Sequence, residues 1–223
     1  MEQPITSRSR ATSRPLADVI EEEIVLGWLQ PRERLVEEEL AARYGVKRHL
    51  VREAIIALER IGLVERVPNK GAVVRMLRAV DVEQIYSVRE ALEVLAAQQI
   101  PLPAAPELID QLERIQERHS AAVAAADPRA AFRANMAFHH ALFGSCGNPH
   151  LAEVIRALEQ KAHGVRSYTA ADPVHLARAR DEHLAIIAAL RGGDRAALVG
   201  LCRSHLAPSN AAYIEALKRR GLA

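Results

Sequence analysis

Apolar residues recur every three to four positions along most of the chain, which is the spacing of helices that bury one face. Before residue 76 this pattern gives way to two short apolar runs, separated by Pro68, Asn69 and Gly71, which favour a tight turn. Gly45 interrupts the helical spacing earlier, because glycine readily adopts the left-handed conformation that ends a helix. The elements expected in this part are helices at about 15–29, 37–43 and 47–61, and strands at 63–67 and 72–75.

Beyond residue 80 the helical spacing continues, and capping residues that each precede a proline divide it into segments. These pairs are Asp127-Pro128, Asn148-Pro149 and Asp172-Pro173. Asp81, with Gln84 three residues later, is expected to cap the first segment. The helices expected here lie near 81–99, 106–124, 128–144, 149–169, 173–191 and 194–219, the last containing Pro208. Short connections between so many helices predict an antiparallel bundle.

The fold class expected is mainly α, with a small β-hairpin wing in the N-terminal part and an antiparallel all-α bundle in the C-terminal part. The expected division is a flexible basic arm at 1–14, a winged helix-turn-helix at 15–75, a linker at 76–80 and the helical bundle at 81–223. The arm is inferred from Arg8, Arg10 and Arg14 in a Ser/Thr-rich start, and plain disorder is the alternative.

A helix, a turn, a basic helix and a hairpin in this order are typical of winged helix-turn-helix domains, which bind DNA. Lys47, Arg48, His49 and Arg52 stand near the start of the third helix, where recognition helices contact base edges. Lys70 and Gly71 stand at the hairpin tip, in position for phosphates or a minor groove. A solvated basic surface on a small helical domain is the alternative, and the hairpin favours the DNA interpretation.

The composition indicates the cellular compartment of the protein more than its function. The formal net charge of +2 is too small to indicate a nucleic-acid partner, so the DNA prediction depends on where the charges lie. Cys146 and Cys202 show no CxxC spacing, which favours a reducing compartment. An apolar signal core and an apolar run of membrane-spanning length are both missing from the sequence, so a cytoplasmic protein without a membrane partner is expected.

A second candidate site comes from histidines of the bundle. Asn135 and His139 are four residues apart and share one face of a predicted helix, while His183 and His205 lie on two later helices. Side chains from facing helices build metal sites in bundle cores, and three imidazoles with a water suit Zn²⁺, and also Ni²⁺ or Mn²⁺. The alternative is that His139 and His205 are packed and satisfied and that His183 is exposed.

Residues 34–75 resemble the winged helix-turn-helix of the GntR family of bacterial transcription regulators. The matching residues are Glu39-Leu40-Ala41, Gly45-Val46, Arg48, Val51-Arg52-Glu53-Ala54-Ile55, Leu58, Gly62-Leu63-Val64, Gly71 and Val74. The resemblance places DNA contacts on Arg48, Arg52, the residues at 47 and 49, and the wing tip at 70–71. Lys47 stands where a Ser or Thr cap is usual and Leu50 replaces a common Pro, so the operator can differ from the family's usual one.

Residues 81–215 resemble the FadR-type C-terminal ligand-binding domain (FCD domain) that accompanies this DNA-binding domain. Its metal-binding members carry an Asp and a His four apart, followed by two more His on later helices. His139, His183 and His205 match this pattern, and Asn135 takes the place of the Asp. The resemblance implies a divalent metal ion, Zn²⁺ first, on these four residues. Because an amide is a neutral and weaker ligand, lower metal affinity or direct binding of an organic ligand are both open.

Arg89 resembles a family arginine that reaches toward the same cavity. In that role it would bind the carboxylate of a small organic acid effector through two hydrogen bonds. The alternative is a surface pair with Glu93, four residues further along the helix.

The predicted function is a DNA-binding transcription regulator, a repressor, that acts as a homodimer on a palindromic operator. A carboxylate-type metabolite bound through the metal would modulate it. One alternative is a metal-responsive regulator, with the metal as effector, and another is a metal-dependent hydrolase. An enzyme is not expected, because no carboxylate near the histidine motifs is an evident general base. Glu182, next to His183, is expected to point to a different helix face.

Overall fold

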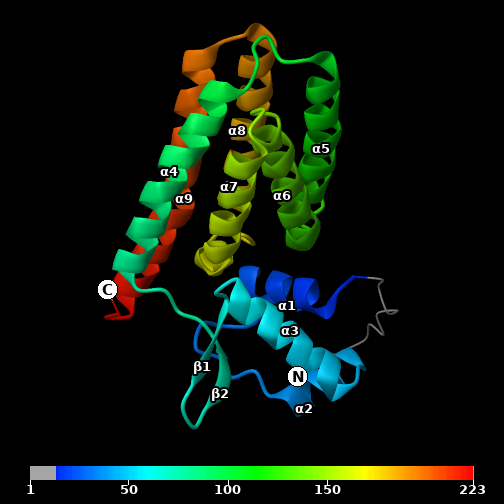
Figure 1. Cartoon of the computed structure of the whole chain (residues 1–223), viewed down its shortest axis with the longest axis vertical. Helices are drawn as coiled ribbons and strands as arrows, with labels where there is room; N and C mark the ends of the chain where they lie inside the picture. The colour runs from blue at the N-terminus through cyan, green and yellow to red at the C-terminus, as the bar shows by residue number, and fades with distance from the viewer. Residues whose placement is uncertain (1–13, 223) are drawn as a thin grey trace.

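The computed structural model describes residues 14–222, so the predicted basic arm, apart from Arg14, lies outside the described residues. The chain forms two bodies, a small N-terminal one (residues 14–75, the head) and a larger helical one (residues 76–222, the bundle) (Figure 1). The predicted fold class is confirmed, since the described chain is mostly helical with a two-stranded antiparallel sheet after the helix-turn-helix.

The head consists of α1 (Leu16–Val25), α2 (Glu37–Tyr44), α3 (Arg48–Arg60), β1 (Val64–Val67) and β2 (Gly71–Val74). Its apolar face follows the spacing seen in the sequence, with Ile20, Val51, Ile55 and Leu58 in one buried cluster. The strands pair in antiparallel register, Val64 opposite Val74. Each strand is displaced by one residue from its predicted start. A bridge from Arg34 to Val73 adds the chain before α2 to this small sheet.

Two glycines end helices of the head. Gly45, with φ 65°, caps α2 and allows the sharp turn into α3. Gly27, with φ 71°, follows the end of α1, so this helix stops at Val25, earlier than the predicted stop at Gln30-Pro31. Lys47 is the N-cap of α3 and its side chain makes no capping hydrogen bond, as its residue type suggests.

The bundle contains α4 (Ala79–Gln99), α5 (Pro106–Ala124), α6 (Pro128–Gly144), α7 (Pro149–Lys161), η1 (His163–Tyr168), α8 (Pro173–Gly192) and α9 (Arg195–Arg219). Asp127, Asn148 and Asp172 cap their helices through side-chain hydrogen bonds, as the sequence predicted. Asp81 is not the cap of α4: Arg78 is, and Asp81 is the third helical residue, whose carboxylate accepts from the Arg78 backbone. α9 continues through Pro208.

The expected helix at 149–169 is wrong in its second half. α7 ends at Lys161 and the chain continues as η1, a short 3-10 helix. A 3-10 helix is tighter and is used in short pieces. η1 packs against α9 of the bundle and against α1 of the head.

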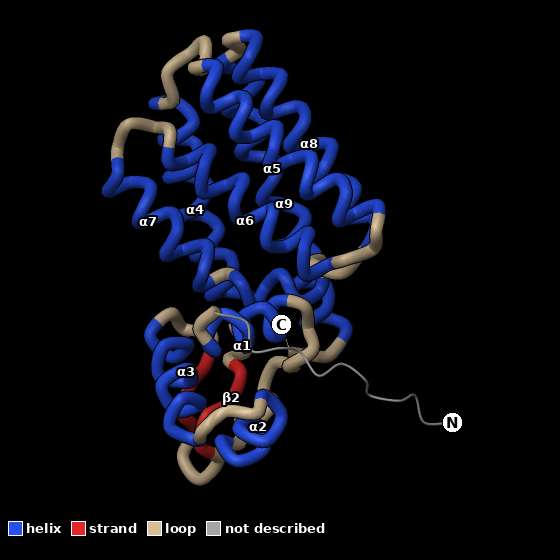
Figure 2. The backbone as a smooth tube through the Cα atoms, turned by 90° about the vertical axis from the view of Figure 1, so that its right-hand side faces the viewer, coloured by secondary structure: helices blue, strands red, loops and turns tan. Residues whose placement is uncertain are grey.

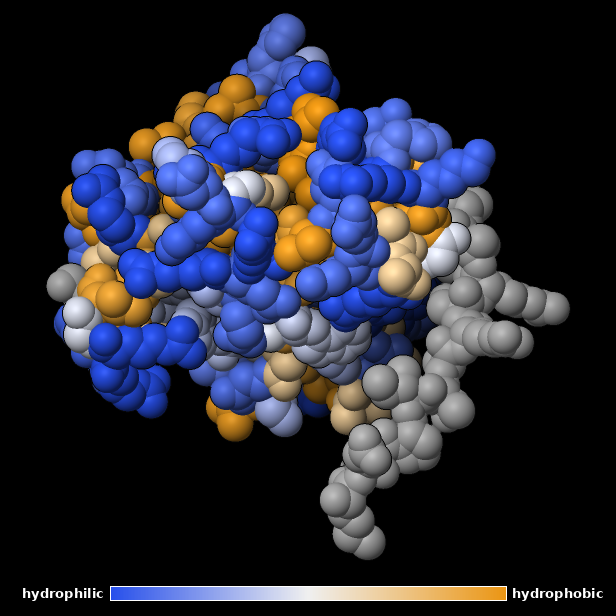
Figure 3. Space-filling model, turned by 90° about the horizontal axis from the view of Figure 1, so that it is seen from below, coloured by the Kyte–Doolittle hydropathy of each residue, from blue (hydrophilic) through white to orange (hydrophobic). Residues whose placement is uncertain are grey.

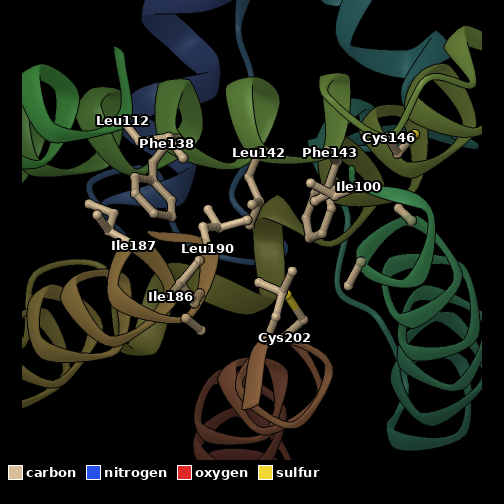
Figure 4. Close-up of a cluster of buried hydrophobic side chains, with 14 of the residues drawn as sticks. Ile100, Leu112, Phe138, Leu142, Phe143, Cys146, Ile186, Ile187, Leu190 and Cys202 are labelled. Carbon is tan, nitrogen blue, oxygen red and sulfur yellow. The ribbon is translucent and has the colours of Figure 1, made fainter. Parts of the chain in front are cut away.

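The main core of the bundle lies between α4, α5, α6, α8 and α9. Figure 4 shows Leu112, Phe138, Leu142 and Leu190 pointing toward one another, with Cys202 of α9 beside them. Phe138 is fully buried and stacks on the ring of His183, with the ring centroids 4.0 Å apart. The apolar core therefore supports one side of the histidine cluster. Among the described residues, none of the helices has the length and apolar character needed to cross a membrane.

α1 forms the contact between the head and the bundle. In Figures 1 and 2 it lies on the side of the head that faces the bundle. Val25 packs with Phe132 and Met136 of α6 in a small apolar cluster. Glu22 accepts two hydrogen bonds from Arg133 of α6, at 2.7 and 2.8 Å. The head and the bundle therefore touch through both apolar and charged contacts.

Candidate functional sites

The basic residues predicted for DNA contact lie together on one exposed surface of the head. Lys47, Arg48, His49 and Arg52 are all exposed at the start of α3, and Leu50 between them is 41% exposed. Lys70 and Gly71 are exposed at the tip of the hairpin. Viewed from the head end (Figure 3), hydrophilic residues cover most of the surface. Among the described residues these six predicted contacts are thus all accessible to a partner.

Glu37 of α2 holds the two arginines of this surface. Its carboxylate accepts from Arg52 Nε and Nη2, at 3.1 and 2.9 Å, and from Arg48 Nε at 2.8 Å. These hydrogen bonds, from Arg52 first and then Arg48, lower the pKa of Glu37 to about 2. Both guanidinium groups are therefore aligned before DNA arrives, and a phosphate or guanine must compete with Glu37 for them. No contact between Glu37 and these arginines was predicted from the sequence.

The second site is a histidine triad at the meeting of α6, α8 and α9. His139, His183 and His205 each offer one ring nitrogen, and these atoms all lie within 4.8 Å of one another. His139 and His183 are buried, and His205 is partly buried. The predicted alternative, an exposed His183, is wrong because the side chain lies beside Phe138 in the core and is 0% exposed.

Two of the triad histidines have partners that fix their tautomers. Gln116 Nε2 donates to Ser120 and to the Arg180 carbonyl, so its Oε1 is free to accept from His183 Nδ1 at 2.9 Å. Glu182 accepts from His205 Nδ1 at 2.5 Å. If the Nδ1 atoms carry the protons, the Nε2 lone pairs point into the cluster, which is how metal-ligating histidines are oriented.

The Nε2 atoms of the triad have few protein partners. His183 Nε2 is buried and has no hydrogen-bond partner in the described chain. His205 Nε2 lies 3.1 Å from His139 Nε2, so one of these two must be protonated unless a cation lies between them. Burial, followed by the neighbouring His205, holds the pKa of His139 and of His183 well below the usual value, so both rings are neutral. Neutral imidazoles with converging lone pairs fit a divalent metal ion.

The position of Glu182 corrects the sequence interpretation. It was expected on a different helix face from His183, yet its carboxylate reaches His205 of the neighbouring α9. Arg178 Nε donates to the other oxygen at 2.7 Å. Glu182 is next to His183 in the sequence, yet it contacts His205 on the adjacent α9. The helix face on which Glu182 lies does not by itself reveal this contact.

A cavity opens beside the triad. Asn135 and His205 line it, together with Glu182, and it encloses about 80 Å³. One water needs roughly 10–15 Å³ on this scale, so the cavity admits a small molecule. Asn135 lies on its wall one helical turn before His139, as predicted, and is 8% exposed. His119 of α5 also lines it, which the sequence analysis missed.

His119 is fully buried, and neither ring nitrogen has a hydrogen-bond partner in the described chain. Burial lowers its pKa to about 4, so the ring is neutral. Its centroid lies 5.2 Å from that of His183. The spacing of Gln116 and His119, three residues apart on one face of the predicted helix, could have indicated that α5 contributes to the site.

Arg89 lines the cavity but its charge is already paired. Its Nε and Nη2 donate to Glu93 Oε1 at 3.0 and 2.8 Å, and both side chains are 2% exposed. The alternative of an i, i+4 pair is therefore the one that forms, although in the interior and not at the surface. A buried pair of this kind is costly to break, because each charge is left without a partner.

Glu159 of α7 is a buried acid next to this pair. It is 1% exposed, its oxygens make no hydrogen bond in the described chain, and Arg89 Nη2 is 4.0 Å away. Burial raises its pKa to about 7, although Arg89 opposes the shift. The folded-state pKa thus lies above the unfolded value. This group's contribution to stability is complete below about pH 4.5 and is lost as the pH rises through about 7.

Glu159→Gln should therefore flatten the pH dependence of stability. Relative to the parent chain, the variant should gain on the order of 2–3 kcal/mol in free energy of unfolding between about pH 5 and pH 8, the equivalent of the pKa shift. Urea denaturation at both pH values measures this. Glu153→Gln, at an exposed position of the same helix, is the matched control and should show no such gain. A gain for Glu159→Gln that is the same at both pH values would contradict a titrating Glu159.

The fold and the exposed basic surface define a class, a winged helix-turn-helix protein with a C-terminal helical bundle. Family models agree with this. The model "Bacterial regulatory proteins, gntR family" matches residues 12–74, and the model "FCD domain" matches residues 84–208. The chain belongs to the GntR family and carries an FCD domain, which confirms the resemblance seen in its sequence. The family consists of transcriptional regulators and not enzymes, as predicted.

Individual relatives are similar to this chain over much of its length. An uncharacterised helix-turn-helix regulator of Bacillus subtilis, YdhC, is 32% identical over 141 residues, which are 63% of this chain and 63% of the relative. The probable D-xylose utilization operon repressor of Paenarthrobacter nicotinovorans is 29% identical over 79% of this chain and 77% of its own. A GntR-type regulator structure from Rhodococcus sp. RHA1 has a TM-score of 0.74 at 26% identity, covering 92% of this chain and 99% of that one. The chain spans slightly less than two thirds of YdhC.

Proposed function

We propose that the chain is a DNA-binding transcriptional repressor whose operator affinity is set by a small organic acid bound at a metal ion in the bundle. The observation that carries this proposal is the coexistence of two sites. An exposed basic surface at the start of α3 suits DNA, and a buried histidine triad beside a cavity suits a metal and a ligand. A repressor is favoured because the Paenarthrobacter relative is named as one.

In this proposal α3 enters the major groove of an operator. Arg48 and Arg52 read guanines, since a guanidinium can donate two hydrogen bonds to one guanine edge. Lys47 and the wing tip contact phosphates, which position the head without reading sequence. The exposed Leu50 is available for an apolar contact such as a thymine methyl. The direct test is to select duplexes from a random pool with the full chain; absence of enrichment would contradict DNA reading by the head.

A homodimer on a palindromic operator follows from an apolar surface on the bundle. Val88 and Leu95 are 50% and 40% exposed on one face of α4, and Val154 of the neighbouring α7 is 48% exposed. Exposed apolar residues on helices that pack against each other favour a protein partner, and a second copy would present two heads to two half-sites. Light scattering of the purified chain should give twice the monomer mass.

The metal would be held by the Nε2 atoms of His139, His183 and His205, with Asn135 as a further oxygen ligand. Zn²⁺ suits this donor set, and Ni²⁺ or Mn²⁺ are alternatives. When bound, the metal supplies a positive charge and an open coordination position for a carboxylate. If the metal itself is the effector, operator affinity will change on metal removal without any organic acid. A hydrolase role is not proposed, because the family members are regulators.

Asn135→Asp should tighten Zn²⁺ binding. A carboxylate brings a negative charge to a site whose other donors are neutral imidazoles, and the ligand set then equals that of the family's metal-binding members. Calorimetry of Zn²⁺ binding to the parent chain and the variant measures the difference. Unchanged affinity would show that residue 135 is not a ligand, and Asn210→Asp, a change on the last helix outside the cavity lining, serves as the control for added charge.

A further inference from the structure

The cavity beside the triad has a second charged group that the sequence analysis did not assign. Arg166 of η1 lines this cavity together with His205 and Asn135. Its side chain is partly buried, and among residues 14–222 it makes no ion pair within 4.0 Å. Its Nη1 donates to the thioether sulfur of Met136, at 3.7 Å, which is a weak acceptor.

The other arginines of the cavity differ from Arg166. Arg89 is bound to Glu93, and Arg178 is bound to Glu182. Burial, and then the nearby Arg89, lowers the pKa of Arg166. A guanidinium carries five donors in a planar fork that matches a carboxylate. An anion that enters the cavity therefore gains most by pairing with Arg166.

Hydroxyl groups extend this donor set. Thr169 and Ser209 line the same cavity, and their oxygens lie 3.3 Å apart. Thr169 Oγ1 also donates to the Arg166 carbonyl, which ties it to η1. The wall of the cavity thus combines a guanidinium with two hydroxyls, a chemistry that suits one carboxylate group of a small organic acid.

η1 also contacts the head. His163 Nδ1, at its first residue, lies 2.7 Å from Glu21 Oε1 of α1. A Cβ built on Gly27, just after α1, would lie 3.2 Å from the backbone oxygen of Ser167. η1 therefore places Arg166 in the wall of the cavity and His163 against α1, the first helix of the head.

We propose that Arg166, and not Arg89, binds the carboxylate of an anionic ligand in this cavity, and that η1 transmits occupancy to α1. This inference rests on the proposed function for its biological meaning. The anion contact itself does not require a metal, so the assignment of Arg166 and the metal part of the proposed function can fail separately. Arg166 is the binding residue, whereas His163 and Glu21 act as positioning residues through the contact between η1 and α1.

The test uses malonate as probe, titrated by calorimetry into the full chain, both metal-free and loaded with Zn²⁺. Arg166→Gln should weaken malonate binding by about 10- to 100-fold, the range for losing a charge-assisted hydrogen-bonded pair. Arg166→Lys should restore part of the affinity. Arg180→Gln removes one positive charge from α8 outside the cavity lining, where Arg180 pairs with Asp181, and should change the affinity by less than about threefold.

Zn²⁺ affinity of Arg166→Gln should equal that of the parent chain, which shows that the bundle is folded. If malonate fails to bind the parent chain, or binds Arg166→Gln equally well, the assignment of Arg166 is overturned. If malonate binding needs Arg166 but Zn²⁺ does not bind at all, the anion site stands and the metal part of the proposed function fails.

Coupling between the cavity and the head is measured by amide hydrogen exchange in α1. Malonate should slow exchange at residues 16–25 of the parent chain. Glu21→Ala removes the acceptor of His163 and should leave malonate affinity within about threefold, because Glu21 does not line the cavity, while abolishing the slowed exchange. Exchange in α1 that does not respond to saturating malonate in the parent chain would overturn the role of η1.

Discussion

Arg52→Ala is expected to weaken binding to a selected operator by about 1–3 kcal/mol, while binding to unrelated DNA weakens much less. The reason is geometric. Arg52 is exposed within the first turns of α3, and Glu37 holds its guanidinium in place before DNA binds. An arginine aligned in this way can donate to both acceptors of one guanine, and alanine replaces neither bond.

Fluorescence anisotropy with operator and with scrambled duplex at one salt concentration measures both affinities, since phosphate contacts depend strongly on salt. Arg60→Ala is the matched control, because Arg60 is exposed at the far end of the same helix. It should change both affinities only slightly. Equal losses on operator and scrambled DNA for Arg52→Ala would make Arg52 a phosphate contact and remove it from sequence reading.

His205→Ala should reduce Zn²⁺ affinity by roughly 100-fold or more, since loss of a partner that only orients a ligand already costs about 10- to 100-fold. His205 is the least buried member of the triad, so its removal should be tolerated by the fold. Its Nε2 faces His139 Nε2, and Glu182 holds its Nδ1. Competition with a metal indicator gives the affinity.

His175→Ala is the control for this variant. His175 lines the same cavity, but it pairs with Asp172 and lies outside the triad. It should bind Zn²⁺ as the parent chain does. Unchanged Zn²⁺ affinity in His205→Ala would show that the three histidines form a packed polar cluster and not a metal site.

Elements with strong local signals were predicted well from sequence. Capping residues followed by proline, at Asp127, Asn148 and Asp172, gave the starts of α6, α7 and α8, because a cap and the first turn depend on neighbouring residues alone. The end of α7 was missed. Its continuation as η1 depends on contacts with α1 and the cavity, and such tertiary contacts leave no local pattern.

The candidate site likewise contains residues that were predicted from the sequence and residues that were missed. His139, His183 and His205 were grouped because their helices and the family resemblance placed them together, and the structure brings them close. Arg166 was missed because it sits in η1, within the range 149–169 that was predicted as one α-helix. Arg89 was considered from sequence, yet its burial with Glu93 changes its role, since helical spacing does not report how deeply a pair lies.

The coupling of the two sites is the central claim. A ligand can shift operator affinity only by its differential affinity for the DNA-competent and incompetent states. Typical coupling is about 1–3 kcal/mol, or roughly 5- to 150-fold, and the operator must change the ligand's affinity by the same factor. The contacts of α1 with α6 and η1 give a physical route between the sites.

The most direct test is the operator Kd of the Zn²⁺-loaded chain, measured with and without the organic acid that most raises its melting temperature in a panel of small carboxylates. For the parent chain we expect a shift of roughly 5- to 150-fold at saturating acid, and no shift for Glu21→Ala, which lacks the contact between η1 and α1. If saturating acid leaves the operator Kd of the Zn²⁺-saturated parent chain unchanged, control of the head from the bundle is contradicted.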